Sequence, residues 1–107
     1  MPDPVLPLEA IPGLPSTASA RILRILLAEP AVREVWLYGS RAMGRHRPGS
    51  DIDLTLVAPD LHHADRLRLM VALDDLLLPW GIDLSLHHEL PPSLRDHVAR
   101  VGRRLAA

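Results

Sequence analysis

Two predicted strands, joined through a Gly-Ser pair and a turn-rich loop, occupy the middle of this chain. Residues 35–38, VWLY, are apolar and aromatic, as is typical of a strand, and the Gly-Ser pair ends them. Residues 51–57 alternate acidic and aliphatic side chains before they become wholly apolar, which predicts a second strand with one polar end. Because successive strand side chains point to opposite faces, Asp51 and Asp53 are expected on one face, about 6–7 Å apart along the backbone.

The turn and the acid pair carry complementary chemistry. Two carboxylates on one face repel each other, and a divalent cation such as Mg²⁺, which prefers oxygen ligands, would remove that conflict. Gly39 lets the backbone approach a phosphate, and a short helix opened by Ser40 would offer N–H groups to an anion. Taken singly, each half has an ordinary explanation, as a strand-to-helix turn or as two solvated acids. Together they indicate nucleoside triphosphate chemistry.

Composition excludes several other kinds of chemistry. The chain has 107 residues, enough for one small domain, and 48% of them are hydrophobic, which favours a globular protein. All 12 basic residues are arginine, so neither a Walker-type phosphate loop nor a lysine nucleophile can exist. With no cysteine, disulfides, thiolate zinc sites and cysteine nucleophiles are excluded too. The net charge of −1 argues against a general binder of nucleic acid or membrane surfaces.

The order of predicted elements gives the fold class. Residues 1–15 contain five prolines, which predicts an extended or disordered lead-in before a domain at residues 16–107. Strands and helices then alternate, which is typical of an α/β layer arrangement. With no leader-like segment and no apolar run of about 18 residues, a cytoplasmic protein is expected. Besides the two central strands and the short helix, the expected elements are helices at 18–29, 60–78 and 94–105 and a strand at 82–87.

The spacing of the central motif resembles a known signature. A Gly-Ser pair, ten residues, and then Asp-Ile-Asp at 51–53 is similar to the pattern of the DNA polymerase beta-like nucleotidyltransferase superfamily. The fuller run GSRAMG…SDIDL resembles its minimal nucleotidyltransferase branch, which usually reads G-S-R-A-R-G, so Met43 stands where a second arginine is usual. The resemblance implies a small polymerase-beta-like core, with a mixed sheet of three or slightly more strands packed by about four helices.

The resemblance also implies a site. A third carboxylate is expected on the next strand, and the aspartate of GIDLSL fits, although a partly exposed strand acid would read the same way. The implied catalytic residues, which would also ligate two Mg²⁺ ions, are Asp51, Asp53 and Asp83. The nucleotide phosphates, with ATP as the expected substrate, would lie on Gly39, Ser40 and Arg41. The arginines near this turn could instead be surface charge or hold a partner protein.

The size of the chain bears on the acceptor. So small a catalytic core leaves little material for an acceptor pocket, which suggests that the acceptor arrives on another protein. Minimal nucleotidyltransferases often pair with HEPN-domain toxins, so the resemblance implies an antitoxin that transfers AMP from ATP to a toxin hydroxyl, with tyrosine expected. Two alternatives stay open. The chain could neutralise its partner by binding alone, or it could modify a small molecule of the aminoglycoside type. Neither a nucleic acid nor a membrane is an expected partner.

Overall fold

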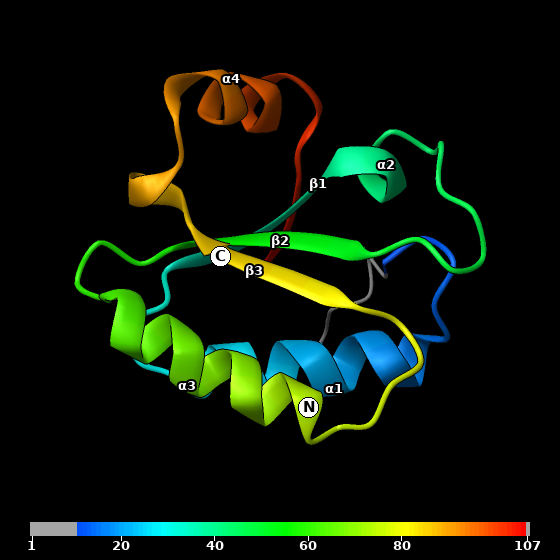
Figure 1. Ribbon diagram of the computed structural model, residues 1–107, viewed down its shortest axis with the longest axis horizontal. Helices are drawn as coiled ribbons and strands as arrows, with labels where there is room; N and C mark the ends of the chain where they lie inside the picture. Colours follow the sequence, from blue (N-terminus) through cyan, green and yellow to red (C-terminus); the bar gives the residue numbers. More distant parts are fainter. Residues whose placement is uncertain (1–10, 107) are drawn as a thin grey trace, which may run out of the picture.

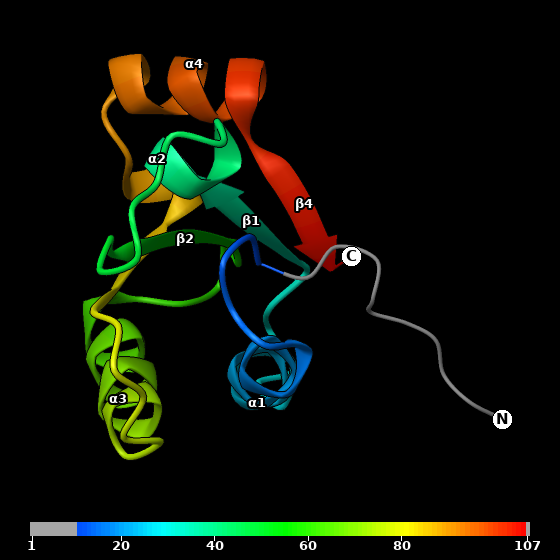
Figure 2. The same ribbon diagram turned by 90° about the vertical axis from the view of Figure 1, so that its right-hand side faces the viewer.

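The computed structural model describes residues 11–106 and folds them into a four-stranded mixed sheet with helices on both faces (Figures 1 and 2). The elements in chain order are α1 (Ser16–Leu27), β1 (Glu34–Tyr38), α2 (Gly39–Ala42), β2 (Ile52–Val57), α3 (His63–Asp74), β3 (Ile82–Leu86), the 3-10 turn η1 (His87–Glu89), α4 (Pro92–Val101) and β4 (Arg103–Ala106). Within this part of the chain, no helix has the length and apolar character needed to span a membrane.

The sheet has the strand order β3-β2-β1-β4. Strands β2 and β3 are parallel, whereas β1 pairs antiparallel with both β2 and β4. Helices α1 and α3 lie on one face of this sheet, and α2 and α4 lie on the other (Figure 1). The predicted α/β class, with a mixed sheet slightly larger than three strands and four helices, is confirmed.

The two faces of the sheet differ in chemistry because strand side chains alternate. Leu37, Leu54 and Leu84 lie in register across three strands and are at most 1% exposed, beneath the helices α1 and α3. The intervening residues point to the opposite face, where they form only a small second cluster with Leu90 and Val98 beneath α4. One face therefore holds the core of the protein, and the other is left for polar chemistry.

The fourth strand corrects the prediction for the C-terminus. The helix expected at 94–105 ends at Val101, and Gly102 takes an extended conformation with φ −64° and ψ 151°. Residues Arg103–Ala106 then form β4, which pairs with β1 and buries Leu105. The apolar spacing at 98, 101 and 105 continued the helical period past Gly102, which is why the sequence alone predicted a single helix.

Several other boundaries also differ from prediction. The helix expected at 60–78 spans His63–Asp74, and in its first turn the Asp65 carboxylate accepts a 2.9 Å hydrogen bond from the His62 N–H. The short helix α2 begins at Gly39, so Ser40 lies within its first turn. The residues after α3 leave the helix through Leu77, whose φ of 56° is left-handed.

The proline-rich start of the chain is only partly described. Residues 1–10, which hold most of the predicted lead-in, lie outside the described residues. Ile11, however, is 1% exposed in the main core, and its N–H donates a 3.1 Å hydrogen bond to Ser19 Oγ. Leu14 is also buried. The segment from Ile11 onward thus packs with the domain, and the domain boundary at residue 15 stays a prediction.

Candidate active site

One row of side chains crosses three strands on the face beneath α4. Tyr38 of β1 pairs with Asp53 of β2, and Asp53 pairs with Asp83 of β3. Paired residues in a sheet point to the same face, so the two carboxylates and the phenol lie side by side. Asp51 comes just before β2 and lies against Gly81, where an added methyl group would be 2.7 Å from its Oδ1. The structure thus brings the three predicted aspartates to one end of two neighbouring strands.

The electrostatics of Asp53 reflect this crowding. Burial raises its pKa most, the carboxylates of Asp83 and Asp51 raise it further, and His97 lowers it. A neutral carboxyl is favoured where a charge would be poorly solvated and would face other negative charges. A cation bound beside Asp53 would therefore relieve this unfavourable charge.

The Gly39 turn lies directly against this carboxylate. Gly39 has a φ of 76°, a left-handed conformation that residues with a Cβ adopt only at a cost. A methyl group added to it would collide with Asp53 Oδ2. A glycine is thus required at position 39 for two reasons: its positive φ and the close approach of the Asp53 carboxylate. The Gly-Ser turn and the acid pair, which form the two halves of the sequence motif, are therefore in contact.

Substitution of Gly39 by alanine should separate these two requirements, because Gly44 offers a matched control. Gly44 also has a positive φ, 72°, but nothing lies within 4 Å of its added methyl group. We expect Gly44→Ala to cost about 1–2 kcal/mol of backbone strain and to leave activity unchanged. Gly39→Ala should cost more and should also remove nucleotidyl transfer, because the Asp53 carboxylate must move. Equal activities for the two variants, measured with stability by thermal unfolding, would contradict this assignment.

His97 of α4 is a site residue that the sequence interpretation missed. Its Nε2 accepts a 3.3 Å hydrogen bond from the Gly39 N–H, and its ring lies edge-on to Tyr38, with 6.1 Å between the centroids. It therefore contacts the two residues at which β1 passes into α2, and it lowers the pKa of Asp53. A weak signal existed, because helical spacing places His97 on the same stripe of α4 as Leu94 and Val101, where an apolar residue would be expected.

Arg41, predicted to bind phosphate, is engaged elsewhere. Its side chain is 1% exposed, and its Nη1 donates a 2.6 Å hydrogen bond to the Pro12 carbonyl. Its Nε and Nη2 both donate to the Ser50 carbonyl, at 3.3 and 2.7 Å. The guanidinium thus ties the start of the domain to the loop before Asp51. Contacts of Arg41 and Ser40 with a phosphate stay a prediction.

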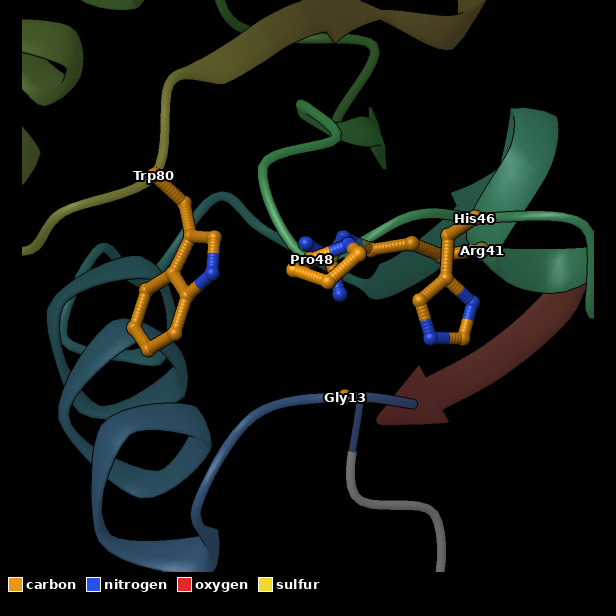
Figure 3. A pocket seen from close by; sticks show the side chains of 5 residues that line it. All are labelled: Gly13, Arg41, His46, Pro48 and Trp80. Atoms are coloured by element: carbon orange, nitrogen blue, oxygen red, sulfur yellow. The ribbon is translucent and has the colours of Figure 1, made fainter.

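A pocket of about 390 Å³ opens beside this guanidinium (Figure 3). Its walls come from the motif loop, from the start of the domain and from the residue before Gly81. The His46 Nδ1 is buried with no hydrogen-bond partner among the described residues. None of the three aspartates lines it, so the pocket adjoins the candidate site without containing its acids. The lining residues are Gly13, Arg41, His46, Pro48 and Trp80.

The donor set of this site fits magnesium in its chemistry. Three carboxylates supply the oxygen ligands that Mg²⁺ prefers, and the raised pKa of Asp53 marks an excess of negative charge that a cation would relieve. The absence of a side chain at Gly39 is what lets the Asp53 carboxylate lie directly against the turn. Among residues 11–106, no three acids or histidines already lie together at ligand distances, so side chains would have to turn inward to share an ion.

These features define a class of protein, and sequence comparison supports it. The sequence matches the family "Polymerase beta, Nucleotidyltransferase" over residues 20–107, and the chain belongs to that family. It is also 39% identical over 51 residues to the probable protein adenylyltransferase MntA of Haemophilus influenzae, a match that covers 47% of this chain and 45% of that protein. The matched region thus spans less than half of that relative's length.

Solved structures agree with the family assignment. The crystal structure of a toxin-antitoxin with AMP-PNP superposes with a TM-score of 0.70 at 27% identity, covering 80% of this chain and 70% of that one. A candidate minimal nucleotidyltransferase superposes with a TM-score of 0.64 at 32% identity, covering 81% and 91% of the two chains. The resemblance drawn from GSRAMG…SDIDL is therefore confirmed.

Proposed function

We propose that this chain is the antitoxin of a HEPN-type toxin and that it transfers AMP from ATP to a hydroxyl of that toxin. The observation that carries the proposal is the contact between the two halves of the motif: the Gly39 turn lies against the Asp53 carboxylate, and Asp53 lies beside Asp83. A triphosphate on the turn would thereby meet the acids at its α-phosphate. Such an arrangement suits transfer of a nucleotide better than transfer of the terminal phosphate alone.

The proposed reaction forms one bond and breaks one. The acceptor oxygen attacks the α-phosphorus of ATP, the bond from that phosphorus to the bridging oxygen breaks, and pyrophosphate leaves while the acceptor proton passes to a carboxylate or to water. Asp51, Asp53 and Asp83 would hold magnesium, whose charge lowers the pKa of the attacking hydroxyl and neutralises the phosphates. The chain supplies no covalent nucleophile, so its residues act by positioning the reactants and by neutralising charge.

Two of the relatives support the nucleotide and the partner. MntA of Haemophilus influenzae is described as a probable protein adenylyltransferase. The toxin-antitoxin with AMP-PNP, at 27% identity, contains an analogue of ATP. Tyrosine as the acceptor, ATP rather than another triphosphate, and two magnesium ions belong to the same proposal. So does a cytoplasmic site of action, where a toxin and its antitoxin would meet.

The test is transfer of label from α-³²P-ATP to a HEPN protein encoded beside this chain, followed by its intact mass. We expect magnesium-dependent increments of one AMP, lost in Asp53→Asn and kept in the control Asp60→Asn, which changes an exposed acid outside the row. Neutralisation of the toxin that survives Asp53→Asn without any adduct would instead favour binding alone. Transfer to an aminoglycoside without a protein partner would favour the small-molecule alternative.

A further inference from the structure

The arginines of this chain are concentrated in two segments that are far apart in the sequence. Residues 39–50 form α2 and the loop after it, and residues 92–106 form α4 and β4. Together these segments hold seven of the 12 arginines but only one of the 13 acidic residues, Asp96. The two segments are therefore strongly positive, although the whole chain has a net charge of −1.

The fold brings the two segments together, and α2, its loop and α4 lie on the same side of the sheet (Figure 2). At the start of α2, the Gly39 N–H donates a hydrogen bond to His97 of α4. At the end of α2, the Ala42 carbonyl accepts a 3.1 Å hydrogen bond from Arg103 Nε of β4. Six of the seven arginines are exposed, and they form what we call the basic surface: Arg45, Arg47, Arg95, Arg100, Arg103 and Arg104.

The positive charge of the basic surface is only partly neutralised within the protein. Among residues 11–106, its ion pairs are Arg100–Asp96 at 2.9 Å and Arg104–Glu34 at 4.0 Å. Both pairs join solvent-accessible side chains, and screening by water and salt makes such pairs weak. The other four arginines of the surface have no carboxylate of the described residues within 4.0 Å of a side-chain nitrogen. A surface field of one sign attracts and steers a partner of the opposite charge.

The basic surface adjoins the candidate active site. The Gly39 turn, at the start of α2, lies against the Asp53 carboxylate. The row of Tyr38, Asp53 and Asp83 lies on the face of the sheet that carries α2 and α4 (Figure 1). A partner that docks on the arginines is therefore held beside the acids. The acids themselves would repel a negative charge placed directly over them.

We propose that the basic surface binds an acidic surface of the acceptor protein and that this contact brings the acceptor hydroxyl to the acid row. The inference rests on the proposed function and identifies where its partner docks. A folded protein can present carboxylates to the arginines and a neutral hydroxyl to the adjoining acids. Each strand of a nucleic acid duplex carries a phosphate about every 3.4 Å along the axis, so it would also place negative charge over the acids. The arrangement of charge therefore favours an acidic protein surface.

Charge reversal tests this docking when formation of the complex with the HEPN partner is measured without nucleotide. The variant Arg45→Glu/Arg95→Glu changes one arginine in each segment of the basic surface. The control Arg24→Glu/Arg33→Glu changes two exposed arginines outside it and alters the net charge equally. At low salt, we expect the Kd of the complex to rise at least roughly tenfold in the first variant and less than about twofold in the control. Because all four side chains are exposed, both variants should stay folded by thermal unfolding.

The salt dependence of the wild-type complex is a second measurement that needs no variant. Raising the salt from about 0.05 M to about 0.5 M should weaken the wild-type complex and should affect the Arg45→Glu/Arg95→Glu complex less. An unchanged Kd in that variant, or an equal rise in the control, would overturn the docking surface, and AMP transfer in the same variant would leave the proposed function standing. A salt-sensitive complex that is weakened by the reversal but forms no AMP adduct would do the reverse. Binding of an RNA oligonucleotide that the reversal abolishes, without an effect on the protein complex, would assign the surface to nucleic acid and overturn the proposal.

Discussion

Asp53→Asn is expected to remove nucleotidyl transfer, by at least about a hundredfold, while leaving the metal-free protein at least as stable as the wild type. The loss of transfer follows because Asp53 is the central residue of the row, between Tyr38 and Asp83, and lies against the Gly39 turn. The stability is retained or raised because burial and the neighbouring carboxylates raise the pKa of Asp53, which means that ionisation of Asp53 opposes folding. Asparagine keeps the shape of the side chain and removes the charge.

The pH dependence gives this prediction a second readout. A carboxyl whose pKa is higher in the folded state favours folding while it is protonated, at and below its unfolded pKa of about 4, and this contribution is lost as the pH rises through the folded pKa. The wild type should therefore lose stability relative to Asp53→Asn as the pH rises above about 4 in the presence of EDTA. Melting temperatures of both proteins across this range would measure it.

The control for Asp53→Asn is Asp60→Asn, an exposed acid in the loop that follows β2. It should leave both the melting temperature and its pH dependence close to those of the wild type. A fall of the melting temperature in Asp53→Asn alone, without magnesium, would mean that the carboxylate holds the fold together, and the metal-binding assignment would lose its basis. Added magnesium should stabilise the wild type more than Asp53→Asn, because a ligand that binds only the folded state stabilises it.

The turn and the acid pair of this site could be predicted because the residues that form them are close together in the sequence. The Gly-Ser turn and the Asp51–Asp53 spacing are each recognised from a few consecutive residues. Strand alternation alone then assigns Asp53 and Asp83 to one face of their own strands. What alternation cannot give is which strands are neighbours. The row exists only because β2 pairs in parallel with β3, and this pairing is set by the burial of Leu54 and Leu84 under α1 and α3.

The long-range part could not be predicted for a physical reason. His97 lies 58 positions after the glycine whose N–H it accepts, and nothing in the local pattern of α4 connects the two. Strand β4 was not predicted because the apolar spacing of α4 continues beyond Gly102. Only pairing with β1 makes residues Arg103–Ala106 a strand. In both cases the deciding contact joins distant parts of the chain, and the local sequence is compatible with either outcome.

Arg41 is a further case in which the local sequence did not give the partners of a side chain. Its motif position predicted a contact with phosphate, and in the structure it contacts backbone carbonyls. Its guanidinium makes three hydrogen bonds to two backbone carbonyls, one of them 29 positions earlier in the chain. Burial lowers its pKa, and the nearby Asp51 carboxylate raises it. A buried cation of this kind is tolerated because its donors are satisfied, and its removal leaves carbonyls without partners.

Arg41→Ala should therefore destabilise the protein by about 3 kcal/mol, because it empties a buried volume and leaves the Pro12 and Ser50 carbonyls unsatisfied. That corresponds to a fall of roughly 13 °C in melting temperature, measured without nucleotide. Arg45→Ala, an exposed arginine of the same loop, is the matched control and should change the melting temperature by no more than about 2 °C. If Arg41 instead served mainly to bind phosphate, Arg41→Ala would keep the melting temperature of the free protein and lose only the stabilisation by added ATP. The two roles are thus separated by thermal unfolding with and without ATP, before any transfer is measured.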